Sequence, residues 1–266
     1  MRHTNHTFQI LICSLIIAAS RLHGEAKLQV RDGHPIVDGV YVNGHGPYRF
    51  LVDTGTNVNL IETDLARSIG LKATFRTELA SSTGVTVVPG SDGTEVVLDS
   101  GKAADQKFLF LGLETIHHRW PDVQGVLGQW FLSRFDYTLD LRAKRLEFRK
   151  QDRTGTRAPF TRTNGRMAVS SSLGELVLDS GADRLVLFGV QPEIGPGNRA
   201  ELRTVAGSQQ IGMVFGKPLI IEGRKIWRGE AVAIPNRPEP GVDGLLPLSL
   251  FKTIYVCNSE SYLVFE

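Results

Sequence analysis

Three segments of the chain place an aspartate, a hydroxyl side chain and a glycine directly after an apolar stretch typical of a strand. They read LVDTG at 51–55, VLDSG at 97–101 and VLDSG at 177–181. A carboxylate can accept or donate a proton during a reaction, so each aspartate is a candidate acid–base group. Because the last two copies are identical, only the surrounding sequence can separate a reactive site from a turn.

The first and third copies occupy equivalent places in an internal repeat. In each half of the chain the Asp motif is followed, at similar spacing, by a second motif of glycine and aliphatic residues, and then by a strand ending near a phenylalanine. Two motifs repeated in the same order are much harder to obtain by chance than one. The matched segments are 48–61 with 174–188, and 122–148 with 241–266.

The second copy has no counterpart in this repeat. Gly101 is followed by the polar stretch KAADQK, whereas Gly181 is soon followed by the apolar RLVLF. Polar residues with Asp, Ser and Gly between two apolar runs are typical of a hairpin turn. We therefore predict that Asp99 lies in a turn and takes no part in chemistry.

The rest of the sequence predicts an all-β chain of two lobes. Short apolar runs alternate with Gly, Pro, Asn and Asp, and helical patterns are few. We expect short helices only at 61–72, with Thr63 as its N-cap, and at 128–135. The polar segment 149–159 separates lobes that we place at 27–150 and 158–266.

The motifs resemble those of the aspartic peptidases. The matching segments are LVDTGT and VLDSGA for the Asp loops, with GVLG at 125–128 and GLLP at 244–247 as the second motif. The first lobe is similar to the bacterial retropepsin-like group. The resemblance implies a bilobal, pepsin-like acid protease fold made of two retropepsin-like β-barrel lobes with few short helices. It also implies an aspartic endopeptidase that acts on peptide or protein substrates.

In such an enzyme one aspartate from each lobe activates a water, and no metal or organic cofactor is needed. We assign this dyad to Asp53 and Asp179, because two close carboxylates that share one proton supply both an acid and a base. We further expect the Thr56 hydroxyl to bond the Asp53 carboxylate, which would make Asp53 the more readily ionised member. The expected supporting residues are Thr54, Gly55, Thr56, Ser180, Gly181 and Ala182.

The resemblance also implies hairpin flaps that cover the substrate. They fall on 79–86 in the first lobe and 203–210 in the second, where small residues stand beside a glycine. The alternative is two ordinary hairpin turns. The expected flap residues are Ser82, Thr83, Gly84, Val205, Ala206 and Gly207.

The N-terminal segment predicts export. Residues 8–20 are almost wholly apolar but too short to span a bilayer, which takes about 20 residues. We read residues 1–26 as a signal peptide, cleaved after Ser20 or Ala26, which leaves no stable membrane span and places the protein in the periplasm or outside the cell. Cys257 is then the single remaining cysteine, and we expect a buried thiol.

Other signals exclude some classes of function. A net charge of +2 without a long basic cluster gives no reason to expect a nucleic-acid partner. His117-His118 lacks the further ligands of a zinc site, so we expect a loop pair and no metal. Two alternatives to a monomeric two-lobed enzyme stay open: a catalytically inactive peptide-binding protein on the same fold, and a retropepsin-like homodimer that uses only the first lobe.

Overall fold

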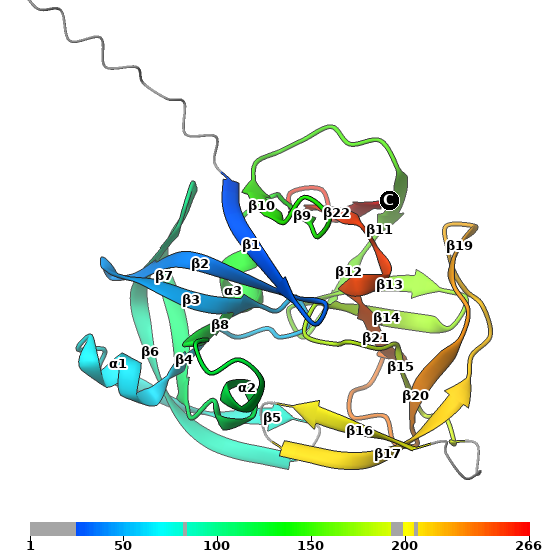
Figure 1. Ribbon diagram of the computed structural model, residues 1–266, viewed down its shortest axis with the longest axis horizontal. Helices are drawn as coiled ribbons and strands as arrows, with labels where there is room; N and C mark the ends of the chain where they lie inside the picture. Colours follow the sequence, from blue (N-terminus) through cyan, green and yellow to red (C-terminus); the bar gives the residue numbers. More distant parts are fainter. Residues whose placement is uncertain (1–24, 82–83, 193–198, 205–206) are drawn as a thin grey trace, which may run out of the picture.

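The computed structural model describes residues 25–81, 84–192, 199–204 and 207–266 (Figure 1). In these residues the chain is mostly β, with short helices at the connections. Many of the short apolar runs form strands, and turn residues with positive φ, such as Asp32, Asp99 and Asn164, follow the end of one strand or precede the next. The predicted two-lobed, all-β class with few short helices is confirmed.

The first lobe is built on eight strands that follow one another in the order β1-β2-β3-β8-β4-β7-β6-β5. β6 also pairs with β2, so the sheet curls back on itself. The strands are β1 (Glu25–Arg31), β2 (His34–Val42), β3 (His45–Val52), β4 (Leu60–Glu62), β5 (Phe75–Ser81), β6 (Gly84–Leu98), β7 (Gly101–Leu111) and β8 (Gly125–Leu127).

The second lobe repeats this order strand by strand, as β12-β13-β14-β21-β15-β20-β17-β16. A separate hairpin of β18 (Leu219–Ile221) and β19 (Arg224–Trp227) is inserted after β17. The sequence repeat therefore extends to the topology of whole lobes. The strands are β12 (Thr161–Thr163), β13 (Arg166–Ser171), β14 (Gly174–Asp179), β15 (Val186–Phe188), β16 (Arg199–Thr204), β17 (Gly207–Phe215), β20 (Glu230–Ile234) and β21 (Gly244–Pro247).

The last strands of both lobes join one sheet, which the sequence did not predict. β9 of the first lobe pairs with β22 of the second, and β1 continues the sheet on one side while β11 ends it on the other. The lobes thus share backbone hydrogen bonds. The additional strands are β9 (Tyr137–Asp140), β10 (Arg145–Phe148), β11 (Thr156–Pro159), β22 (Thr253–Cys257) and β23 (Tyr262–Phe265).

This shared sheet bears on the expected boundaries of the lobes. β1 begins at Glu25, and the buried Ala26 pairs with Leu146 of β10. Of the two cleavage positions considered, the one after Ser20 would leave β1 whole. The signal peptide itself falls almost entirely outside the described residues and stays a prediction. No helix in the described ranges is long and apolar enough to cross a membrane.

The helices agree only in part with expectation. α1 (Thr63–Ser68) forms where predicted, but its N-cap is Glu62 and no side chain caps it. α3 (Gln129–Leu132) and the 3₁₀ turn η1 (Leu248–Leu250) are short. α2 (Glu114–Arg119) was missed, and the histidine pair lies in it rather than in a loop.

The VLDSG segment at 97–101 forms a turn, as predicted. β6 ends at Leu98, which pairs with Gly101 at the start of β7. Asp99 between them is exposed and has a φ of 51°, a value that aspartate tolerates in tight turns. Cys257, also as expected, is a buried free thiol.

The shared sheet predicts where shortening a side chain lowers the stability of the fold most. Val256 in β22 is fully buried, whereas Val87 in β6 is 53% exposed. Val256→Ala should lower the free energy of unfolding by about 2–3 kcal/mol, because it removes buried methyl groups and leaves a cavity. The same change at Val87 should cost less than about 1 kcal/mol in denaturant unfolding. Equal losses would contradict this assignment of the core.

Candidate active site

Parallel strand pairs bring the two aspartates to equivalent positions. Asp53 directly follows β3, which runs parallel to β8, and its N–H donates to the Leu127 carbonyl at 3.0 Å. Asp179 ends β14, which runs parallel to β21, where it pairs with Pro247. Each second motif of the sequence repeat is therefore the strand that supports the Asp loop of its own lobe.

The hydroxyl residues after the aspartates join the two loops reciprocally. The Thr54 hydroxyl donates to the Leu178 carbonyl at 2.9 Å and accepts from the Ser180 N–H at 3.0 Å. The Ser180 hydroxyl donates to the Val52 carbonyl at 2.7 Å and accepts from the Thr54 N–H at 2.9 Å. Both side chains are buried, so these bonds replace the water that the four backbone groups would otherwise bind.

The glycines after them face the opposite carboxyl groups. A Cβ atom added to Gly55 would lie 2.2 Å from Cγ of Asp179, and one added to Gly181 would lie 2.9 Å from Oδ2 of Asp53. No side chain fits in that space. Each loop therefore needs glycine because the carboxyl of the other lobe lies directly against its backbone. The structure brings Asp53 and Asp179 together within hydrogen-bonding reach.

Burial raises the pKa of both carboxyl groups, because charge is costly away from water. For Asp179 the nearby negative charge of Asp53 raises the pKa further. For Asp53 burial is partly offset by the N–H of Gly55, which donates at 2.8 Å, and by the N–H of Thr56. The pair titrates as a unit, and its favoured form has Asp53 ionised and Asp179 protonated.

The expected role of the Thr56 hydroxyl is wrong. In the described residues no bond joins this hydroxyl to Asp53; its oxygen instead lies 3.5 Å from the N–H of Val58. The donor is the backbone N–H of Thr56, which any residue except proline would supply at this position. Ala182 has no hydroxyl at the equivalent position of the second lobe.

Two buried amides of the first lobe support the Asp53 loop and the second motif behind it, and both were missed from the sequence. Gln129 donates to the Thr54 carbonyl at 2.9 Å. Asn59 accepts from the N–H of Gly128 at 3.0 Å and donates to the Lys107 carbonyl. Gln129 directly follows the second motif at 125–128, and the motif alone did not reveal the contact of this side chain with the loop.

Two basic residues near the dyad were also missed. Nε2 of His34 lies 3.0 Å from the Gly181 carbonyl, and Nη1 of Arg166 lies 3.4 Å from the Gly55 carbonyl. Both contacts cross between the lobes. A sequence signal did exist, because DGH at 32–34 and NGR at 164–166 stand at equivalent places before the two Asp motifs.

The expected flaps form hairpins. β5 and β6 pair up to Ser81 and Gly84, and β16 and β17 pair up to Thr204 and Gly207; both hairpins run along the lower edge of the molecule in Figure 1. Their action on a substrate stays a prediction. The tip residues Ser82, Thr83, Val205 and Ala206 lie outside the described residues.

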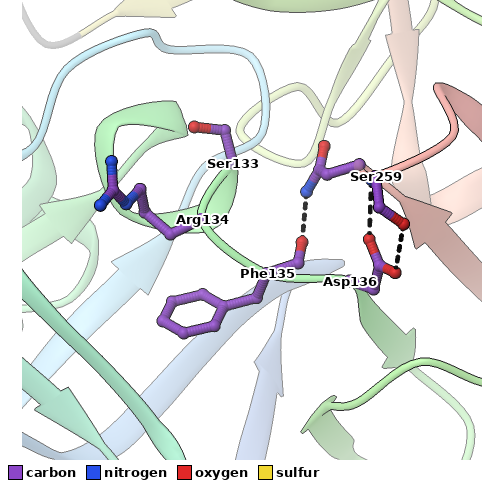
Figure 2. A pocket seen from close by; sticks show the side chains of 6 residues that line it. Ser133, Arg134, Phe135, Asp136 and Ser259 are labelled. Atoms are coloured by element: carbon purple, nitrogen blue, oxygen red, sulfur yellow. Dashed lines mark hydrogen bonds between the residues drawn. The ribbon is translucent and has the colours of Figure 1, made fainter.

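The other candidate sites are structural. Among the described residues no cluster of His, Cys, Asp and Glu could hold a metal ion, and His117 instead contacts the Val123 carbonyl at 2.8 Å. Trp120 is buried in the core of the first lobe. Figure 2 shows a pocket on the connection after α3, where the Asp136 carboxylate accepts two bonds from Ser259. None of the residues that line this pocket belongs to the dyad.

Comparison with known proteins gives one family match within the first lobe and a likeness of fold. Residues 39–131 match the family model of aspartyl proteases, a segment that contains Asp53. The chain is similar in fold to an aspartic proteinase from Irpex lacteus, with a TM-score of 0.51 and 14% sequence identity. The match covers 91% of this chain and 96% of that chain. A retropepsin-like aspartic protease from Rickettsia conorii covers 46% of this chain and 88% of its own at 23% identity, with a TM-score of 0.35. No curated protein matches the chain.

The reciprocal hydroxyl bonds predict a sharp difference between two substitutions. Thr54→Ala leaves the Leu178 carbonyl and the Ser180 N–H buried without partners, so the free energy of unfolding should fall by at least about 2 kcal/mol. Thr54→Ser keeps the hydroxyl and loses one methyl group, so the free energy of unfolding should fall by only about 1 kcal/mol. Denaturant unfolding of both variants tests this. A serine variant as unstable as the alanine variant would show that the hydroxyl bonds contribute little.

The raised pKa of Asp179 predicts a stability that depends on pH. Below about pH 4 the carboxyl is protonated in both folded and unfolded chains. As the pH rises, the unfolded chain ionises first, so the wild type loses stability until the native group ionises too. Asp179→Asn does not titrate there. Its free energy of unfolding should therefore gain on that of the wild type from pH 4 to pH 7, by up to about 1.4 kcal/mol per pH unit, as measured by denaturant unfolding at each pH. A constant difference across this range would contradict the shift.

Proposed function

We propose that this chain, which resembles the aspartic peptidases in its motifs and its fold, is an aspartic endopeptidase. The observation that carries the proposal is the adjacency of two buried carboxyl groups, one from each lobe, whose loops are joined by the bonds between Thr54 and Ser180. This arrangement supplies one protonated and one ionised carboxyl at a single point. Those are the acid and the base that hydrolysis of an amide by water requires.

The asymmetry of the dyad assigns the roles. The ionised Asp53 accepts a proton from a water held between the carboxyls, and the water oxygen attacks the carbonyl carbon of the peptide bond. Asp179 donates its proton to the carbonyl oxygen, which becomes a hydroxyl. When the tetrahedral intermediate collapses, the C–N bond breaks, the amine leaves with a proton from the dyad and the hydroxyl returns its proton. Water is the nucleophile throughout, so the reaction calls for no cofactor.

An extended peptide is the substrate class that suits a site between two β lobes. Such a chain can add backbone hydrogen bonds to exposed strand edges, as in strand addition. The β5–β6 and β16–β17 hairpins are the elements proposed to close over it, with Gly84 and Gly207 beside their tips. A single chain provides both halves of the dyad, which supports a monomer.

Export is part of the same proposal and rests on the apolar segment 8–20 alone. We place the protein in the periplasm or outside the cell, where it would meet peptide or protein substrates. The full chain and a form beginning at Arg21, expressed in bacteria and fractionated, test this, because only the former should reach the periplasm.

Substitution of each aspartate tests the chemistry. Asp53→Asn and Asp179→Asn should each lower kcat/KM on a denatured protein or peptide mixture by at least a hundredfold, about the contribution of one acid–base group. Asp99→Asn, in the exposed turn between β6 and β7, is the matched control and should leave the rate unchanged. Cleavage is followed by mass spectrometry across the acidic and neutral pH range.

The same variants separate the alternatives. Full activity of Asp179→Asn would point to a homodimer that uses only the first lobe. Binding of a peptide by the wild type without cleavage at any pH would indicate an inactive peptide-binding protein. Loss of activity in Asp99→Asn with activity retained in Asp179→Asn would contradict the repeat on which the site is built.

A further inference from the structure

The first hairpin of each lobe carries a matched basic residue. The Asp-Gly turn at 32–33 has φ values of 51° and 85°, and the Asn-Gly turn at 164–165 has values of 48° and 80°. Turns of this kind connect antiparallel strands tightly. The next residue is the first of its strand in both cases: His34 in β2 and Arg166 in β13. Equivalent turns thus present a histidine in one lobe and an arginine in the other.

Both residues reach the glycine of the opposite Asp loop. His34 contacts the Gly181 carbonyl at 3.0 Å, and Arg166 contacts the Gly55 carbonyl at 3.4 Å. These are the glycines whose backbones lie against the two carboxyl groups. A shift of either loop would therefore change both its contact with a basic side chain and the distance between the aspartates.

Both ring nitrogens of His34 face carbonyl oxygens. Its Nδ1 lies 2.9 Å from the Asp32 carbonyl, and its Nε2 lies 3.0 Å from the Gly181 carbonyl. A carbonyl oxygen can only accept, and a neutral imidazole has only one N–H. In either neutral tautomer one ring nitrogen would direct its lone pair at a carbonyl oxygen. The imidazolium donates to both, and at 3% exposure little water could substitute.

The charged groups around His34 come from several elements. The Asp53 carboxyl after β3 is close enough that the charge of His34 lowers its pKa. The Asp32 carboxylate in the hairpin turn is paired with Arg119 of α2 at 3.0 Å. Arg119 also lies over the ring of Trp120, which packs against His34 at 4.8 Å. Because Asp32 is already paired with Arg119, Asp53 is the carboxyl whose pKa we expect to respond to the charge of His34.

Arg166 provides the comparison within the same molecule. Its guanidinium is paired with Glu239 and lies near both aspartates. An arginine keeps its charge at any pH at which the protein is folded, whereas histidine is the side chain whose charge ordinarily changes between pH 5 and 8. One lobe therefore has a permanent cross-lobe donor, and the other has one that depends on a proton.

We propose that protonated His34 is a positioning residue for the dyad: by donating to the Asp32 and Gly181 carbonyls together, it fixes the Gly181 loop of the second lobe against the first. When the pH rises and the ring loses its proton, one of its two hydrogen bonds is lost, along with the cation beside Asp53. The kinetic consequence rests on the proposed peptidase activity. The protonation of the His34 ring between two carbonyl oxygens does not depend on that activity.

The proton is tested first, on the unmodified chain. In ¹⁵N-histidine NMR of the wild type at pH 5, both ring nitrogens of His34 should be protonated, with His34→Gln serving to assign the signals. Raising the pH to 8 should remove one proton and shift the backbone amide of Ala182, whose peptide group contains the Gly181 carbonyl. A ring with a single proton already at pH 5, or an Ala182 amide that does not respond, would overturn the proposal whether or not the chain cleaves peptides.

The pH dependence of kcat/KM is tested second. His34→Gln keeps a donor but no charge, so the pKa of Asp53 should rise and the acid limb should move to higher pH, on the order of one unit. Its kcat should fall about tenfold, with KM affected less, because His34 touches no substrate. His34→Arg, which copies the second lobe, should restore the acid limb. His45→Gln, at an exposed position in β3, is the control and should match the wild type.

An acid limb that stays in place in His34→Gln would overturn the proposal, because a residue that only supports the fold would lower the rate equally at all pH values. Absence of cleavage by the wild type would count against the proposed function and leave the NMR result as the test of His34.

Discussion

The structure depends on one reciprocal interaction, the four hydrogen bonds by which Thr54 and Ser180 join the two Asp loops. Every residue that supplies a donor or acceptor to this set is buried. If the loops moved apart, these groups would lose their hydrogen-bond partners, which would cost stability. The carboxyl groups are brought together as a consequence. Two adjacent carboxylates repel each other strongly, so only one of them is ionised. The four bonds between the loops oppose this repulsion, and each bond joins a group of one lobe to a group of the other.

The remaining fold can be understood as support for this contact. Each Asp loop follows a strand in a parallel pair, and the shared sheet from β11 to β1 holds the lobes in register behind it. Glycine at 55 and 181 removes the side chains that would separate the loops. The cost is a site whose raised carboxyl pKa values weaken the fold as the pH rises, a local penalty of the kind that active sites impose on the protein around them.

Sequence reasoning found what repeats locally and missed what depends on distant pairing. The two Asp motifs, the all-β class and the Asp99 turn follow from short patterns. The pairing of β9 with β22 has no such signal, because the sequence of a strand does not specify which distant strand it pairs with. α2 was missed although Leu113, Ile116 and Trp120 are spaced as a helix face and are buried. His34 and Arg166 were missed because a basic residue after a turn ordinarily points to solvent, and only the fold shows where these two turns lie.

The differences between the lobes explain how a nearly symmetric pair can have distinct members. Two identical carboxyls in identical surroundings would share a proton equally. Burial raises the pKa of both carboxyl groups, and each accepts the N–H of the glycine two residues on. Asp53 also accepts the N–H of Thr56 and lies in the field of His34, whereas the charge of Asp53 raises the pKa of Asp179. The repeat therefore supplies the adjacency, and departures from the repeat decide which carboxyl holds the proton. A titratable histidine on one side and a permanent arginine on the other extend that asymmetry beyond the loops, so the balance within the pair becomes a property of the whole interface between the lobes.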